Sequence, residues 1–301
     1  MTRLEHVDVR PLRESDLPEA DRIFRLAFGT FLELPDPMAF GGDRDLVGGR
    51  WRIDPAAALG AYRGGELVGS NFVTVWGSVG FFGPLTVRPD LWDRGVARSL
   101  LDATVALLDA RGVRHGGLYT FAESPRHTTL YQKYGFWPRF LNVTFRLEAV
   151  PGVFSCRSDE APGEFRAITD VIYEGFDLTR EVEAVRVLGA GDTVVADGAF
   201  AVCHVGPGTE GGRGTCYVKC AAVRPGAGAG ERFEALLDAC LGFAHARGAE
   251  VVVAGVDTGR TDAYRRLLAR GGRVTQQGIA MHRPGEPGYD RPDVHALDDW
   301  R

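Results

Sequence analysis

The sequence contains no uninterrupted apolar run that approaches the ~18 residues needed to span a membrane. Residues 1–13 mix acidic and basic side chains without an apolar stretch, so we expect no secretory signal. Positive charge is not in excess either, because 35 Lys and Arg stand against 40 Asp and Glu, a formal net charge of -5. These absences argue against nucleic acid or a membrane as the main partner and predict a soluble, cytoplasmic protein.

Cysteine is scarce and is confined to the second half of the chain. The five cysteines are Cys156, Cys203, Cys216, Cys220 and Cys240. The only close pair, Cys216 and Cys220, has no matching second pair, so the spacing does not favour a structural zinc site. We therefore expect reduced, buried thiols and no metal.

Length and composition indicate an ordinary globular chain with more than one domain. The 301 residues are 45% hydrophobic and 25% charged, which argues against disorder and against a fibrous protein. At ~100 to 200 residues per domain, this length predicts about two domains.

An internal repeat supports two domains. The tripeptide Val87–Pro89 recurs at 223–225, and the tetrapeptide Leu100–Ala103 recurs at 236–239, each 136 residues further along. We therefore interpret the chain as two homologous domains, residues 1–148 and residues 149–301. The second domain includes a C-terminal tail, which we expect to pack over the surface through Tyr289 and Trp300.

The spacing of apolar residues predicts an α/β fold with a mixed sheet in each domain. In the first domain the patterns place strands at 7–12, 61–63, 67–75, 79–87, 117–121 and 136–147, and helices at 14–28, 96–111 and 125–134. We expect the strand at 136–147 to close the first domain.

One strand-to-helix junction carries the clearest chemistry. Gly95 and Ala97 open the helix at 96–111 with almost no side-chain bulk, so an anion can approach the unpaired N–H groups at the positive end of the helix dipole. Arg94 and Arg98 add positive charge on the same turn. Small residues here are also typical of simple close packing against a sheet, so the junction alone does not decide between the two interpretations.

Two motifs decide in favour of the anion. Gly95-Val96-Ala97 resembles motif A of the GNAT superfamily, the acyl-CoA-dependent N-acyltransferases, although Trp92 replaces the leading Gln or Arg of that motif. The segment Leu130–Phe136 resembles motif B, in which a tyrosine on a short helix precedes Gly-Phe. The resemblance extends over the first 147 residues and implies the GNAT fold and an N-acyltransferase activity.

The resemblance also implies a role for individual residues. The helix start would hold the CoA pyrophosphate, the backbone of the preceding strand would bind the pantetheine arm, and Tyr131 would protonate the leaving thiolate. The implied pyrophosphate residues are Arg94, Gly95, Val96, Ala97, Arg98 and Ser99, and the pantetheine residues are Leu85 and Val87. Ser124 stands where many relatives have an asparagine that also contacts the pantetheine.

The sequence offers several candidates for the general base that takes a proton from the amine. Glu123, at the end of the strand 117–121, is our candidate, and Glu33, Asp36 and Asp43 in the loop after the first helix are alternatives. His127 is the other titratable residue nearby.

The second domain lacks the residues that carry this chemistry. In the register of the repeat, Gly95 becomes Glu231, Ala97 becomes Phe233 and Tyr131 becomes Leu267. Glu231 would repel a pyrophosphate and Phe233 would fill the space above the helix, so we expect a degenerate copy that does not bind CoA in the same way.

We therefore expect an N-acetyltransferase that moves an acetyl group from acetyl-CoA, its cosubstrate, to a primary amine on a small molecule or peptide. The first domain contains no cysteine for an acyl-enzyme, which favours direct attack in a ternary complex. Two alternatives stay open: a non-catalytic acyl-CoA-binding or regulatory module, and a mycothiol synthase-like acetyltransferase. The sequence leaves a homodimer open as well.

Overall fold

The computed structural model describes residues 7–156 and 162–300. In the N-terminal half the elements are β1 (Asp8–Pro11), α1 (Leu17–Phe31), α2 (Gly48–Ile53), β2 (Ala58–Arg63), β3 (Glu66–Trp76), β4 (Val79–Phe82), β5 (Thr86–Val87), α3 (Val96–Ala110), β6 (His115–Thr120), α4 (Pro125–Gln132) and β7 (Trp137–Glu148). The strand expected at 79–87 is divided into β4 and β5, because Gly83 and Pro84 interrupt its ladder.

In the C-terminal half a similar succession follows. Its elements are β8 (Ser155–Cys156), α5 (Pro162–Ile172), α6 (Thr179–Val187), β9 (Gly191–Ala196), β10 (Ala199–Gly206), β11 (Gly212–Val223), α7 (Ala229–Ala246), β12 (Val251–Asp257), α8 (Thr261–Ala269), β13 (Arg273–Arg283) and β14 (Ala296–Leu297). The elements β12, α8 and β13 each begin 136 residues after β6, α4 and β7. The repeat in the sequence is therefore also a repeat in structure.

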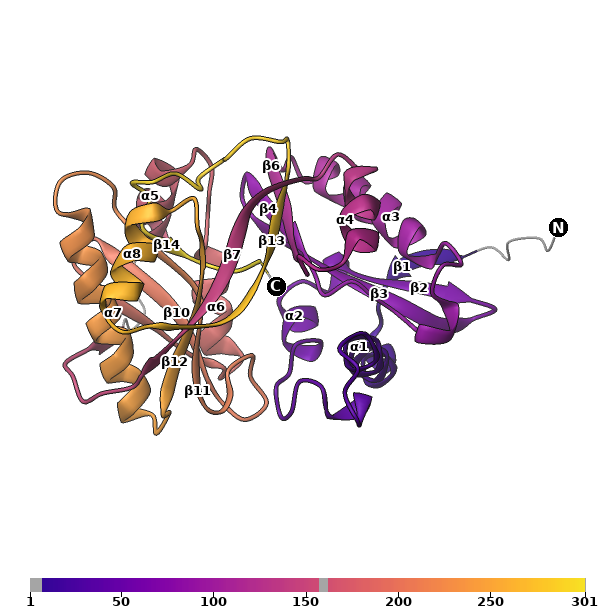
Figure 1. Ribbon diagram of the computed structural model, residues 1–301, viewed down its shortest axis with the longest axis horizontal. Helices are drawn as coiled ribbons and strands as arrows, with labels where there is room; N and C mark the ends of the chain where they lie inside the picture. The colour runs from indigo at the N-terminus through magenta and orange to yellow at the C-terminus, as the bar shows by residue number, and fades with distance from the viewer. Residues whose placement is uncertain (1–6, 157–161, 301) are drawn as a thin grey trace.

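The strands of both halves join one long mixed sheet, with helices above and below it (Figure 1). Within the described residues the order is β1-β2-β3-β4-β6-β13-β7-β12-β11-β10-β9-β8, with β5 beside β3 and β14 beside β11. The mixed α/β fold class predicted from the sequence is confirmed. Within the described ranges, no helix combines the length and the apolar character needed to traverse a bilayer.

The two halves exchange their last strands. β7, the last strand of the N-terminal half, pairs antiparallel with β12 of the C-terminal half, from Glu148 opposite Val251 to Asn142 opposite Asp257. β13, its counterpart, pairs antiparallel with β6 of the N-terminal half and with β7 itself. The strand at 136–147 therefore closes the sheet of the other half, and each half completes the sheet of its neighbour.

An apolar cluster and the C-terminal tail fill the space between the halves. Trp76 and Phe81 pack with Phe176, Tyr289 and Trp300 in one buried cluster. The tail was expected on the surface, and this expectation is wrong: Tyr289 is 0% and Trp300 3% exposed. Aromatic rings of this size gain more from burial than a surface position offers, and Tyr289 and Trp300 also satisfy their polar atoms, since the Trp300 indole N–H donates to the Tyr289 hydroxyl at 2.9 Å.

Candidate active site

Two parallel strands separate at the centre of the N-terminal half. β4 pairs with β6 from Val79 opposite His115 to Phe81 opposite Gly117. Beyond that point the chain turns at Gly83, whose N–H donates to the carbonyl of Phe72, and β5 pairs with β3 instead. Since no strand of residues 7–156 and 162–300 lies between β5 and the end of β6, the backbone there is accessible to an extended ligand.

A cavity of about 580 Å³ occupies this space. Its size lies within the ~300 to 1,000 Å³ range of small-molecule sites. Its wall includes two groups of residues that the sequence singles out, namely Leu85, Val87 and Ala97 from the β5–α3 segment and Glu123, His127 and Tyr131 from α4 and the turn before it. The separated strands and the cavity therefore lie at the two sequence motifs, one at the start of α3 and one in α4.

The start of α3 has the geometry of an anion site. Gly95 adopts φ 86°, a left-handed conformation that favours glycine, and a Cβ added there would have no neighbour within 4 Å. The N–H groups of Arg98 and Ser99 donate to the Gly95 carbonyl at 3.0 and 3.2 Å, so these two amides already serve the first helical turn. Helix geometry leaves the amides of Val96 and Ala97 without intrahelical acceptors.

The flanking side chains fit this geometry. Arg94 and Arg98 are exposed, Ser99 is half-buried, and Ala97 lines the cavity. Trp92, which replaces the polar residue of motif A, donates its indole N–H to the carbonyl of Val87 at 2.8 Å. The carbonyl of Val87 therefore already accepts a hydrogen bond. Leu85, the other residue predicted to bind the pantetheine, lies outside any strand, and its backbone is in the gap.

Tyr131 is placed where a proton donor is needed. It comes from α4, lines the cavity, and packs edge-on against Phe82 of β4 with ring centroids 5.9 Å apart. Burial raises the pKa of the Tyr131 hydroxyl far above its ordinary value. The phenol therefore carries its proton at neutral pH.

The carboxylates that the sequence offers as bases fall in different places. Glu123 is exposed and lines the cavity. Asp36 caps a short 3-10 turn through the N–H of Met38, and Asp43 accepts the N–H of Arg213. Neither of these two, nor Glu33, is among the residues of the cavity wall.

Two further predicted residues can be placed. His127 lines the cavity 5.1 Å from the ring of Phe31, and burial together with the charge of Arg126 lowers the pKa of its imidazole. Ser124 is buried at the start of α4 but is not part of the cavity wall.

A buried charged cluster was not found by sequence reasoning. Arg50 of α2 lies 3.0 Å from Glu210, and Lys219 of β11 contacts both oxygens of Glu210 at 2.8 and 3.0 Å. Arg50 and Glu210 line the cavity, as does Tyr217, whose hydroxyl donates to Asp299 at 2.8 Å. No local pattern signals this cluster, because its members come from both halves of the chain.

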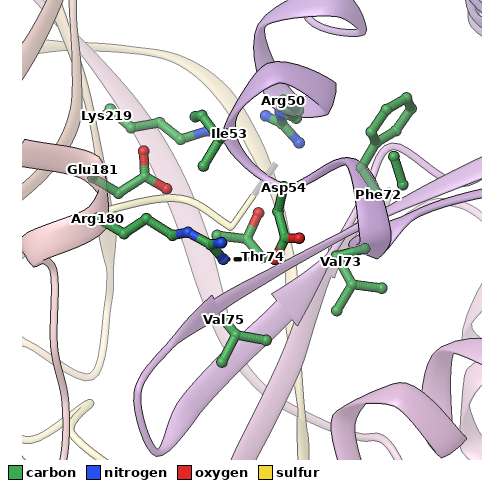
Figure 2. Close-up of a pocket in the computed structure, with 12 residues that line it drawn as sticks. Arg50, Ile53, Asp54, Phe72, Val73, Thr74, Val75, Arg180, Glu181 and Lys219 are labelled. Atoms are coloured by element: carbon green, nitrogen blue, oxygen red, sulfur yellow. Dashed lines mark hydrogen bonds and ion pairs between the residues drawn. The ribbon is translucent and has the colours of Figure 1, made fainter. Parts of the chain in front are cut away.

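Next to this cluster the halves make a second polar contact, shown in Figure 2. Arg180 of α6 points at Asp54, at the end of α2, with 2.6 Å between the charged atoms. Glu181 accepts the indole N–H of Trp76 at 3.0 Å. The void between these residues is only about 10 Å³, room for one water at most, so this place is an interface and not a ligand site.

The corresponding position in the C-terminal half is closed. Arg232 donates to the carbonyls of Arg224 and Ala227 in the loop before α7, at 2.8 and 3.0 Å. Phe233 and Leu267 are fully buried. The loop is therefore bound by its own side chain. The repeat placed Glu231 opposite Gly95, but α7 begins three residues earlier than that register predicts, so Glu231 lies inside the helix and Gly228, with φ 76°, precedes it.

Comparison with known proteins identifies a family for the N-terminal half. Residues 21–136 match the model of the acetyltransferase (GNAT) family, a span that contains the separated strands, the start of α3 and Tyr131. No curated protein matches the chain.

Solved structures resemble the whole chain in fold. A proposed acetyltransferase from Pyrococcus horikoshii has a TM-score of 0.70 at 16% identity, over 98% of this chain and 95% of its own. A GCN5-related N-acetyltransferase from Sphaerobacter thermophilus has a TM-score of 0.57 at 15% identity, over 94% of this chain and 96% of its own. The family match and the fold together show that the chain contains a GNAT acetyltransferase domain and is an acyltransferase.

Proposed function

We propose that the N-terminal half transfers the acetyl group of acetyl-CoA to a primary amine, and that residues 149–301 form a degenerate second copy that completes its sheet and cavity. The observation that carries the proposal is the continuity of the cavity wall. One cavity extends from Trp92 and Ala97 at the start of α3, past Leu85 and Val87, to Tyr131. An extended thioester laid in this gap would have a phosphate site at one end and a proton donor at the other.

The pyrophosphate would lie on the amides of Gly95, Val96 and Ala97, with Arg94 and Arg98 supplying charge and Ser99 a hydroxyl. The pantetheine would follow Leu85 and Val87 as an extra strand. Because no cysteine contributes to the cavity wall, the acyl group would pass directly to the amine. The amine nitrogen bonds to the thioester carbon, the carbon–sulfur bond breaks, and the sulfur takes the proton of the Tyr131 hydroxyl.

Two groups of the cavity wall can accept the proton of the amine. Glu123 is the carboxylate predicted for this role, and His127 is kept neutral by its lowered pKa. Glu210 is unsuited, because Arg50 and Lys219 hold its pKa low even though burial alone would raise it. Either Glu123 or His127 would act directly or through a water.

The cavity wall favours an acceptor with an apolar body. The rings of Phe28 and Phe40 stack at 5.1 Å, and those of Phe31 and Phe121 lie 4.9 Å apart, all four on the wall. Aromatic rings bind apolar and aromatic groups, and their faces also attract a cation. We therefore propose an arylalkylamine or a comparable small cytoplasmic amine as the acceptor.

The test is thiol release from acetyl-CoA, followed with a chromogenic thiol reagent in the presence of a panel of amines. We expect release that depends on the amine, fastest with arylalkylamines and slower with aliphatic polyamines. Calorimetry with acetyl-CoA is the companion measurement. Binding without release by any amine would indicate a non-catalytic CoA-binding module, and absence of binding would overturn both assignments.

A further inference from the structure

Three buried side chains in the C-terminal half converge outside the cavity. They are Asp257 at the end of β12, His282 in β13 and Asp290 in the tail, and each is at most 3% exposed. One ligand atom of each lies within 4.8 Å of the others. The Nε2 of His282 is 3.3 Å from Oδ2 of Asp290. The proposed acetyl transfer uses none of these residues.

The other polar atom of each of these side chains forms a hydrogen bond with a neighbouring group. Oδ1 of Asp257 accepts the N–H of Gly259 at 2.8 Å, and Oδ1 of Asp290 accepts the Nε–H of Arg260 at 2.6 Å. Nδ1 of His282 lies 3.1 Å from the carbonyl oxygen of Glu286. A carbonyl only accepts, so Nδ1 carries the proton and Nε2 presents a lone pair. Metal-binding histidines are typically oriented by this kind of bond to a backbone carbonyl.

Two of the converging atoms lack the hydrogen-bond partners that buried polar atoms usually have. Oδ2 of Asp257 and Nε2 of His282 have no hydrogen-bond partner, although both are shielded from water. Arg260 is already shared between Asp290 and Asp298, at 2.6 and 2.9 Å. Two carboxylates and an imidazole lone pair that face one another repel each other unless a positive charge lies between them.

We propose that Asp257, His282 and Asp290 bind a divalent metal ion, with Zn²⁺ as the best fit, in a structural role. One imidazole nitrogen and two carboxylate oxygens are donors that zinc accepts, and with three protein ligands a water would take the fourth position of a tetrahedral site. The sequence does not predict this site, because its residues show no ligand spacing. The proposal therefore departs from the expectation that the protein binds no metal.

The ion would tie together two strands and the tail at the place where the halves exchange strands. The ring of Trp300 lies 4.9 Å from the ring of His282 and also forms part of the cavity wall. A metal that fixes His282 and Asp290 would therefore fix one wall of the cavity. Its loss should lower the stability of the whole chain.

The test uses the full chain, purified without a polyhistidine tag, stripped with a chelator, incubated with excess Zn²⁺ and freed of unbound metal by gel filtration. Metal content by mass spectrometry should be about one zinc per chain. His282→Ala and Asp257→Asn should lose the zinc, whereas His245→Ala, which removes an exposed histidine of α7, should retain it. A chelator should lower the Tm of the wild type and of His245→Ala but not that of the two ligand variants.

A measurement on the wild type alone keeps the proposal testable if the ligand variants fail to fold. Co²⁺ in place of Zn²⁺ should give visible absorption bands of a four- or five-coordinate site, bleached by added Zn²⁺. A wild-type chain that retains no zinc and shows no such bands would overturn the proposal, and would indicate that a proton shared by the carboxylates supplies the charge. Retention of zinc by a folded Asp257→Asn variant would overturn it as well.

Discussion

The guanidinium of Arg50 lies 3.0 Å from the carboxylate of Glu210, and this buried ion pair joins α2 of the N-terminal half to the loop before β11 of the C-terminal half. Lys219 contacts the same carboxylate, so two cations surround one anion at the wall of the cavity. Removal of the anion would take away the carboxylate that lies between two buried positive charges.

We expect Glu210→Gln to destabilise the protein by ~3 to 5 kcal/mol, the usual cost of breaking a buried ion pair. Urea unfolding followed by circular dichroism measures the difference. Glu174→Gln is the matched control, because Glu174 pairs with Arg114 at 3.1 Å on the surface, where such pairs contribute only ~0 to 1 kcal/mol. Equal effects of the two substitutions would contradict the importance of the buried cluster.

The same ion pair predicts a dependence on pH. Burial would raise the pKa of Glu210, but Arg50, Lys219 and His204 outweigh it and hold the pKa below its ordinary value of 4.5. A carboxyl whose pKa is lower in the folded state stabilises the fold fully above its unfolded pKa and loses this contribution as the pH falls. The stability difference between wild type and Glu210→Gln should therefore shrink below about pH 4.5. A difference that stays constant down to pH 3 would argue against it.

Tyr131→Phe tests the proton donor. Loss of the hydroxyl should lower kcat by ~100-fold or more, while the Kd of acetyl-CoA stays nearly unchanged, because the hydroxyl acts on the departing sulfur and not on the bound thioester. Steady-state thiol release and calorimetry separate the two quantities. Tyr264→Phe, in the helix of the second copy, is the control and should behave like wild type. Turnover by Tyr131→Phe at the wild-type rate would show that the Tyr131 hydroxyl is not the proton donor.

Gly95→Glu tests the anion site. The new carboxylate would repel the pyrophosphate, and we expect the Kd of acetyl-CoA to rise at least about tenfold. The substitution also strains a left-handed backbone position, at ~1 to 2 kcal/mol. Gly228→Glu controls for this strain, because Gly228 precedes α7 with φ 76°. It should leave acetyl-CoA binding intact. Equal loss of binding in both variants would point to misfolding and not to the site.

A comparison of Glu123→Gln with His127→Gln should identify the group that accepts the amine proton. Loss of the base should lower kcat/KM by ~100- to 10,000-fold and abolish the rise of activity with pH. If His127 is the base, the wild-type profile rises with a midpoint below 6.5, because burial lowers its pKa. If both variants keep the pH dependence of the wild type, neither residue is the general base.

The exchange of β7 and β13 predicts that the halves do not fold alone. A fragment of residues 1–148 would expose the edge of β6, which β13 covers, and the apolar surface of Trp76 and Phe81. We expect it to aggregate or to unfold without cooperativity in circular dichroism. Joint expression with residues 149–301 should restore a complex that binds acetyl-CoA. A monomeric fragment with a sharp unfolding transition would contradict this.

Local signals in the sequence account for what could be predicted. Gly95, Ala97 and Tyr131 lie in short motifs, and the 136-residue repeat indicated two related halves. The pattern of the strand at 136–147 gives the strand itself but not its partner, because β6 and β12 offer similar edges. The Arg50–Glu210 pair and the burial of Trp300 depend on contacts between the two halves, which no local pattern records.

The strand exchange also bears on how such a chain can change over time. Since β13 lies between β6 and β7, a chain without residues 149–301 would lose the strand that joins these two, and β7 would lose its second partner, β12, as well. Truncation of either half is therefore closed to such a chain. The same requirement applies to Phe233, which is fully buried in the apolar cluster of the C-terminal half.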